Sequence, residues 1–163
     1  MKKIYFLLAI VLVASLIAGC GTNDDSAETV DVKRVGDAEF GFLTIPEDWN
    51  NFSDIGMTNS GIPHIGFRSL TGSIINLISY EGILEDVDID QFMQQMGVEY
   101  EMVKIDGNDA FRTHVYFEGY DMHLYGWYFV DSDAIFRLIT AEGFADEILQ
   151  VKAIVENTFS MTY

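Results

Sequence analysis

Three pairs of alternating apolar and polar segments, each joined by a tight turn, constrain the fold of this chain most strongly. The pairs are 62–69 with 73–80, 98–105 with 110–117, and 122–130 with 134–140. Asp106-Gly107 joins the middle pair, and Asp-Gly between such segments is among the strongest short-range signals for a β-hairpin. Thr71-Gly72 and Asp131-Ser132-Asp133 join the other two. A further strand from Phe40 ends at Pro46, because proline cannot donate to a sheet ladder.

Two segments change from the strand period to the helical period. Asp88–Met96 begins with a capping aspartate and has Gln91 three residues later, which is the capping-box spacing, with Phe92 and Met96 on one face. A second helix is predicted from about Gly143 to Asn157. Its apolar stripe consists of Phe144, Ile148, Val151 and Val155. The sequence therefore predicts an α+β fold, an antiparallel meander sheet of about six strands with a long C-terminal helix and a short mid-chain helix packed on it.

The N-terminus has the plan of a secretory signal: Lys2 and Lys3, an apolar run, and small residues before the only cysteine. Residues 17–20, Ile-Ala-Gly-Cys, resemble the bacterial lipobox. The resemblance implies diacylglycerol on the Cys20 thiol and cleavage before Cys20. An uncleaved membrane helix is the alternative, but the run 4–18 is shorter than the roughly 20 residues that cross a bilayer. We expect a lipid-anchored protein on the outer face of a bacterial cell membrane.

Residues 1–19 are thus predicted to be the lipoprotein signal peptide, 20–35 the acylated cysteine and a flexible polar tether, and 36–163 a single α+β domain. With Cys20 acylated, no thiol remains for a disulfide, a metal ligand or a nucleophile. The formal net charge is −17, and loss of the signal lysines makes it more negative. This charge argues against nucleic acid and anionic lipid as partners and leaves cationic ligands, basic proteins and metal ions open. We expect a monomer.

Three short motifs are spread over residues 39–160. They are Phe40-Gly41-Phe42 before Ile45-Pro46-Glu47-Asp48-Trp49, then Gly107-Asn108-Asp109-Ala110, then Ile154 with Thr158-Phe159. Together they resemble motifs of the PsbP-like α/β/α sandwich superfamily. The resemblance implies an antiparallel sheet covered by helices, used by non-enzymatic accessory and binding proteins with differing partners, bacterial lipoproteins among them. It carries over no functional residue.

Aromatic residues are concentrated between residues 116 and 129, and the candidate binding surface consists of Tyr116, Tyr125, Trp127 and Phe129. Such residues usually build a sheet core, but an uncovered face would be an interface. Tyr125, Trp127 and Phe129 share a face with His123. His64, His114 and His123 show no metal-ligand spacing, so no metal or cofactor is predicted. His114 and His123 lie on strands that could pair and bring the two rings together.

No nucleophile with a base and an orienting acid is recognisable: the chain has no Gly-x-Ser-x-Gly elbow, no Ser-x-x-Lys and no phosphate-binding glycine loop. The sequence therefore favours a non-enzymatic, membrane-tethered binding or accessory module with a protein or small-ligand partner. A small envelope hydrolase using His114 and His123 is one alternative. The other is a carrier that holds a small ligand in an aromatic pocket between helix and sheet.

Overall fold

The computed structural model describes residues 30–52, 62–81, 83–84 and 87–163. Cys20, the lipobox-like run and most of the predicted tether lie outside these residues. The elements are β1 (Val32–Asp37), β2 (Gly41–Pro46), β3 (Asn50–Asn51), β4 (His64–Arg68), β5 (Ile74–Ser79), α2 (Ile89–Met96), β6 (Tyr100–Ile105), β7 (Asn108–Phe117), the 3₁₀ turn η1 (Glu118–Tyr120), β8 (Met122–Val130), β9 (Phe136–Phe144) and α3 (Ile148–Thr158). Among the described residues, no helix is long and apolar enough to cross a membrane.

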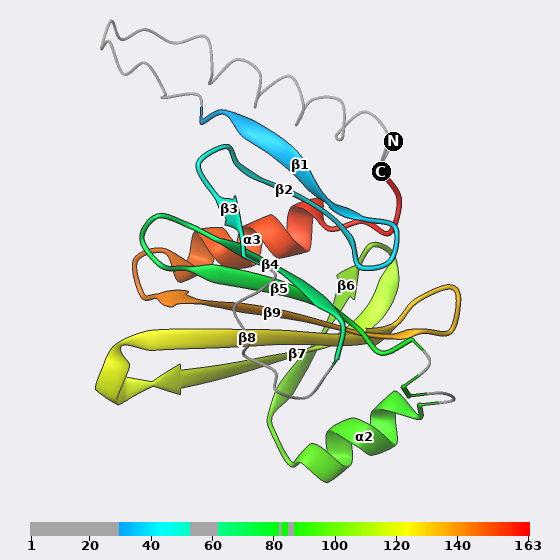
Figure 1. Ribbon diagram of the computed structural model, residues 1–163. Coiled ribbons are helices and arrows are strands. Elements are labelled where there is room, and N and C mark those ends of the chain that lie inside the picture. Colours follow the sequence, from blue (N-terminus) through cyan, green and yellow to red (C-terminus); the bar gives the residue numbers. More distant parts are fainter. Residues whose placement is uncertain (1–29, 53–61, 82, 85–86) are drawn as a thin grey trace, which may run out of the picture.

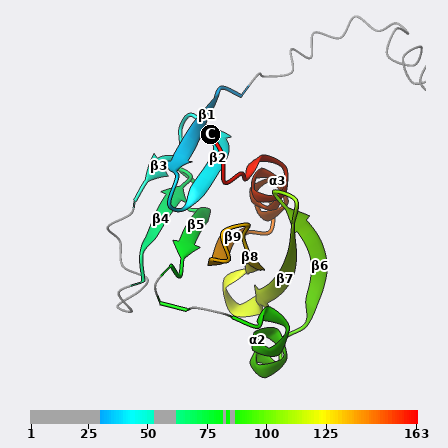
Figure 2. The ribbon, with the colours of Figure 1, turned by 90° about the vertical axis from the view of Figure 1, so that its right-hand side faces the viewer.

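The predicted α+β class is confirmed. An antiparallel seven-stranded sheet has the order β3-β4-β5-β9-β8-β7-β6, and β1 and β2 form a second, two-stranded sheet. The large sheet is not a simple meander, because β5 pairs with β9, whereas the β6–β7 hairpin follows at the far edge. Figure 2 shows α3 and the β1–β2 sheet over one face of the large sheet and α2 at the other face.

Two of the predicted hairpin turns have the backbone that their residues favour. Asp106 and Gly107 have φ values of 48° and 81°, so both central residues of this turn are left-handed, as a type I′ turn requires. Gly72 has φ 104° in the β4–β5 turn, and its amide donates to the carbonyl of Ser69 over 3.3 Å. These turns fix the register of the strands that they join.

One contiguous core lies between the large sheet, α3 and β2. Its fully buried members include Leu43 and Ile45 of β2, Trp127 and Phe129 of β8, and Val155 of α3. On the opposite face, α2 covers only one end of the sheet. Asp88 caps this helix by accepting from the amide of Gln91, as predicted, but the buried residue is Met93, whereas Met96 is exposed.

Two predicted boundaries are wrong. Strand β9 continues to Phe144, because β8 extends to Met122 and pairs with β9 along its whole length, so Phe144 belongs to a strand and α3 begins only at Ile148. Strand β1 begins at Val32, inside the segment predicted to be tether. Its pairing with β2 is reinforced by Lys33, which donates to the carbonyls of Glu47 and Trp49 over 2.7 Å each.

The β8–β9 turn is held by a buried ion pair. Asp131 and Arg137 have side-chain exposures of only 2% and 4%, and the Arg137 Nε lies 2.8 Å from the Asp131 Oδ2. The other carboxylate oxygen accepts from the amides of Asp133 and Ile135. Arg137 also donates to the carbonyl of Glu39, so the pair ties this turn to the loop before β2.

Candidate functional site

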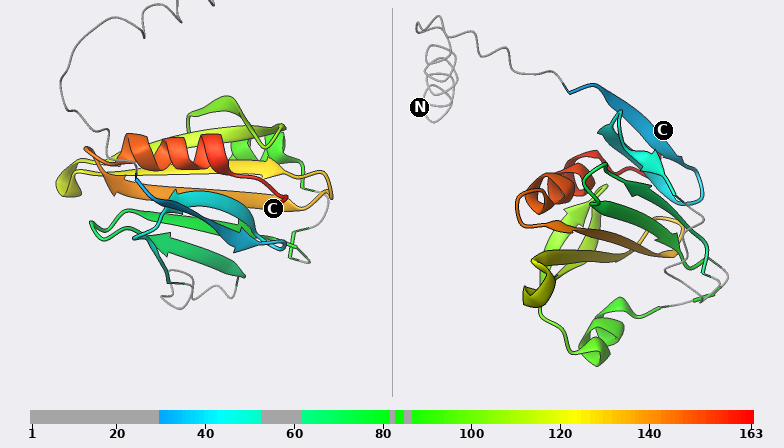
Figure 3. Two further views of the ribbon diagram at one scale, coloured as in Figure 1. Left: turned by 90° about the horizontal axis from the view of Figure 1, so that it is seen from above. Right: turned by 60° about the vertical axis from the view of Figure 1, so that its left-hand side comes forward.

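The β7–β8 hairpin reaches past the elements that cover the rest of the sheet. Strands β7 and β8 pair out to Phe117 and Met122, whereas β6 pairs with β7 only as far as Thr113. Figure 1 shows the hairpin, with η1 at its tip, extending beyond the end of α3, and the view from above in Figure 3 agrees. The outer part of the hairpin is therefore the place where strand side chains meet solvent.

Four rings from the two strands form a stacked row on the side of the sheet that faces α3. We call this row the aromatic ladder; it consists of Tyr116, His123, His114 and Tyr125. The ring centroids lie 4.6 Å apart for Tyr116 and His123, 5.1 Å for the two histidines, and 4.4 Å for His114 and Tyr125. The ladder arises because Tyr116 lies opposite His123, and His114 lies opposite Tyr125, in the β7–β8 register.

The ladder passes from solvent into the core. Tyr116 is 48% exposed and His114 is exposed, whereas His123 and Tyr125 are half-buried. Trp127, whose ring centroid is 5.8 Å from that of Tyr125, is fully buried. Two of the predicted surface residues, Trp127 and Phe129, are therefore corrected to core residues, because α3 and β2 cover the inner half of this face. Tyr116 and Tyr125 stay in the candidate surface.

Charged side chains from three elements border the inner end of the ladder. Arg112 on β7 is paired with Glu101 on β6 and with Glu156 on α3. The Trp127 Nε1 donates to the same Glu156 oxygen over 3.3 Å, and the Lys152 Nζ lies 5.9 Å from the centre of the Tyr125 ring. These contacts hold the buried end of the ladder in place.

The two ladder histidines are bonded to each other. The Nε2 of His114 lies 2.9 Å from the Nδ1 of His123, so one ring donates and the other must be neutral to accept. Burial lowers the pKa of His114 below 6.5, and the charges of His123 and Arg112 lower it further. The lowered pKa favours the neutral form of the His114 ring, which stacks on the His123 ring.

A shallow depression of about 270 Å³ lies beside the ladder where β6 begins. Its lining residues are Glu99, Tyr100, Glu101, Arg112, His114 and Tyr125. Pockets for drug-sized ligands usually measure about 300 to 1,000 Å³ and are mostly apolar. This depression is smaller and bordered by charges, so it suits one side chain of a partner better than an enclosed small molecule.

The opposite side of the hairpin is also apolar. Val115, Phe117 and Phe144 are 40%, 38% and 44% exposed, and Met122 and Leu124 between them are half-buried. Sequence reasoning missed Val115 and Phe117, although the Asp106-Gly107 turn carried a usable signal. That turn places Tyr100 opposite Thr113. Because the preceding helix is predicted to end at Met96, only three residues remain before Tyr100, too few to form a strand beside the residues that follow Thr113.

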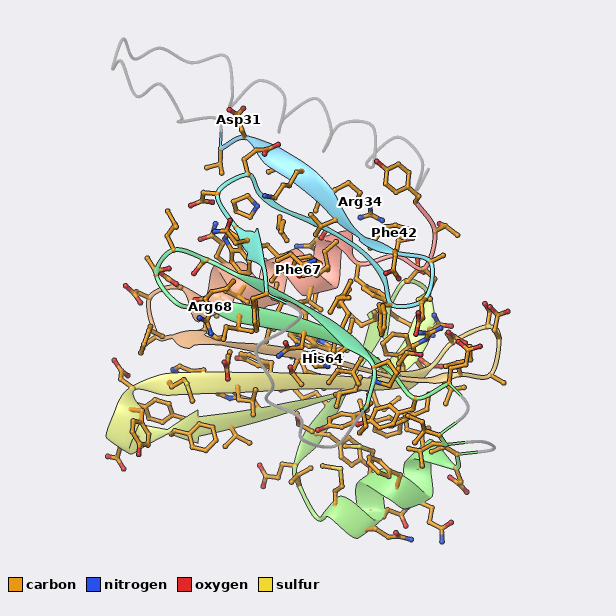
Figure 4. All side chains as sticks on the ribbon, viewed as in Figure 1. Asp31, Arg34, Phe42, His64, Phe67 and Arg68 are labelled. Carbon is orange, nitrogen blue, oxygen red and sulfur yellow. The ribbon has the colours of Figure 1, made fainter. Side chains whose placement is uncertain are left out.

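Metal ligands and a nucleophile are the groups that a catalytic role of the ladder histidines would need beside them. In the described part of the chain, no group of three or more His, Cys, Asp or Glu side chains could hold a metal ion. Each ladder imidazole is hydrogen-bonded to the other ring and, within the same part of the chain, to no hydroxyl that could act as a nucleophile. The third histidine, His64, lies on β4 (Figure 4), and two strands, β5 and β9, separate β4 from β8, which carries His123.

The sequence matches no protein-family model and no curated protein sequence. Solved structures do match. One is the solution structure of the cyanobacterial PsbP protein CyanoP from Synechocystis sp. PCC 6803. The match covers 87% of this chain and 96% of the CyanoP chain, with 14% identity and a TM-score of 0.52. Another is the crystal structure of LpqN of Mycobacterium tuberculosis, described as involved in cell envelope biogenesis; this match covers 86% of this chain and 98% of the LpqN chain, with 14% identity and a TM-score of 0.46. The chain thus shares the PsbP-like fold of CyanoP, as the sequence motifs indicated.

Proposed function

We propose that this chain is a non-enzymatic accessory protein, lipid-anchored on the outer face of a bacterial cell membrane, that binds a protein partner through the outer β7–β8 hairpin. The observation that carries this proposal is the exposed end of the aromatic ladder, backed by exposed Val115 and Phe117 on the other side. Tyrosine and phenylalanine are enriched in the buried centres of protein interfaces. The likeness to CyanoP supports an accessory role, because the sequence resemblance to PsbP-like proteins implies such roles.

A protein partner fits the site better than the two alternatives. A carrier would need an enclosed apolar pocket, but the depression beside the ladder is open to the surface and bordered by Glu99, Glu101 and Arg112. A hydrolase would need a nucleophile within hydrogen-bond reach of a base. In the residues described, His114 and His123 bond to each other instead.

Site-specific photocrosslinking in living cells tests the binding surface. A photoreactive phenylalanine analogue replaces Tyr116, and in the matched control it replaces Tyr163, which is 89% exposed at the chain end. We expect a discrete protein adduct from position 116 and none from position 163. Equal labelling, or no adduct at position 116, contradicts the proposal. Turnover of an envelope substrate that disappears in His114→Ala, while the fold survives, would favour the hydrolase.

The anchor rests on the lipobox-like run alone, and Cys20 lies outside the described residues. Two acyl chains on Cys20 would give stable membrane attachment, whereas a single chain binds only marginally. The substitution Cys20→Ala should leave the precursor unacylated and uncleaved. Intact-mass analysis of the purified chain checks this, and a wild-type N-terminus without lipid, or one that starts at another residue, rejects the anchor.

A further inference from the structure

Among the described residues, the outer edge of β7 has no partner strand over its last four residues. Strand β8 pairs with β7 from Ala110 to Phe117, but on the other side β6 pairs only from Asn108 to Thr113. Within the described residues, the backbone of His114–Phe117 is thus bonded on one side. We call this outer side the free edge. Alternate residues of a strand direct their amide and carbonyl groups to the same side, so the free edge offers hydrogen-bond donors and acceptors to an incoming chain.

The free edge lacks the usual protection against strand pairing. Natural edge strands carry lysines, prolines or bulges that discourage another strand from adding. The neighbouring edge strand β6 has the charged residues Glu101 and Lys104. The free edge reads His-Val-Tyr-Phe, has neither lysine nor proline, and all four residues are exposed. A chain that adds here gains backbone bonds and side-chain contacts on both faces of the hairpin.

Charge selects the kind of chain that can add. Glu99 and Glu101 border the depression beside His114, and Glu118 and Asp121 lie at the hairpin tip. Glu101 forms an ion pair with Arg112, whereas Glu99 and Glu118 form no ion pair with any described residue. Together with the overall charge of −17, these carboxylates attract a basic segment.

We propose that an extended, basic segment of a protein partner adds to the free edge as an eighth strand, in line with β6. Its alternate side chains divide between the two faces. Lysine or arginine side chains lie over Tyr116 and His114 and reach Glu99, where ring faces and carboxylates both attract cations. Apolar side chains on the other face pack against Val115 and Phe117. The inference deepens the proposed function and rests on it.

A second copy of this chain is the main competing occupant, and the charges disfavour it. Edge-to-edge pairing of two copies would place the acidic borders of both hairpins together, and each copy carries −17. Like charges brought together at an interface suppress association. We therefore expect the full chain to remain monomeric by sedimentation, and a dimer that needs the free edge would overturn the choice of a basic partner.

Synthetic peptides of about eight residues, a common strand length, test the mode of binding. The probe alternates Lys and Val, one control alternates Glu and Val, and a second control is the Lys-Val peptide with backbone amides methylated. Titration into the full ¹⁵N-labelled chain in zwitterionic detergent should shift the amides of residues 114–117 and slow the exchange of those on the free edge. The Kd should be at least about tenfold weaker for both controls. Equal binding of the methylated peptide excludes strand addition, and equal binding of the Glu-Val peptide excludes the charge argument.

A pair of lysine substitutions tests the location. Val115→Lys adds the residue that natural edges use against pairing, in the middle of the free edge. Leu149→Lys adds the same charge on α3, where the side chain is 69% exposed. We expect the first variant to lose most of the Lys-Val peptide affinity and the second to keep it within about twofold, with unchanged circular dichroism for both. Equal effects of the two would place the binding elsewhere.

The two proposals can fail separately. A partner adduct from position 116 without peptide binding at the free edge would keep the accessory function and reject strand addition. If the Lys-Val peptide slows amide exchange at residues 114–117 but no adduct forms in cells, the free edge binds basic strands and the proposed cellular function is rejected.

Discussion

Truncation of Trp127 separates the core end of the aromatic ladder from its surface end. The indole is fully buried among Tyr125, Ile139 and the residues of α3. A buried tryptophan removes about 150 to 250 Å² from water. At about 25 cal/mol per Å² this corresponds to roughly 4 to 6 kcal/mol, and measured Trp→Ala changes cost about 3 to 5 kcal/mol. We expect Trp127→Ala to lower the free energy of unfolding by about 4 kcal/mol, a large fraction of the roughly 5 to 15 kcal/mol typical of a whole domain.

Urea denaturation followed by circular dichroism measures this loss. Trp127→Phe is a second variant in case the alanine protein does not fold; it keeps most of the ring volume and loses the hydrogen bond to Glu156, which retains Arg112 and Lys152 as partners. It should lose about 1 to 2 kcal/mol. Tyr116→Ala, at the exposed end of the ladder, should leave the denaturation midpoint nearly unchanged, because that side chain is 48% exposed. A loss below about 1 kcal/mol in Trp127→Ala, or marked unfolding in Tyr116→Ala, would refute the division between core and surface.

Three further predictions follow from charges in the structure. Asp131→Ala leaves the buried Arg137 without its carboxylate and should lower the free energy of unfolding by about 3 to 5 kcal/mol in urea denaturation; a double variant with Arg137→Met that recovers none of the loss would contradict this. Because the pKa of His114 is lowered in the folded chain, the unfolded chain binds the proton first. As pH falls from above 6.5 through the lowered pKa, the free energy of unfolding should therefore decrease more for the wild type than for His114→Gln. Urea denaturation of both proteins over this pH range measures the difference, and a larger decrease for His114→Gln refutes a lowered pKa of His114. The high negative charge should make the melting temperature of the full chain rise between about 10 and 150 mM monovalent salt, and a fall would show that self-repulsion is unimportant.

The sequence by itself determined the features that depend on neighbouring residues. Asp106-Gly107 folds as a tight hairpin turn because both positions tolerate positive φ, and Asp88 begins α2 because its carboxylate accepts the amide of Gln91. These interactions span only a few residues, so a local pattern contains all the information that they need. The alternation of the strands and the α+β class follow from the same local patterns.

Only the tertiary structure decided which strands are neighbours and which ladder residues meet solvent. Strand β5 pairs with β9, far along the chain, so the meander was wrong in its order. Tyr116 and Trp127 lie on the same face and in the same alternation, yet one is half exposed and the other buried. Trp127 is buried because α3 and β2 lie over it, and Tyr116 is exposed because it lies beyond the ends of both elements. The local sequence pattern does not specify where these elements end above the sheet. The buried Asp131–Arg137 pair was missed for the same reason, because Arg137 is buried only once the loop at Glu39 folds against it.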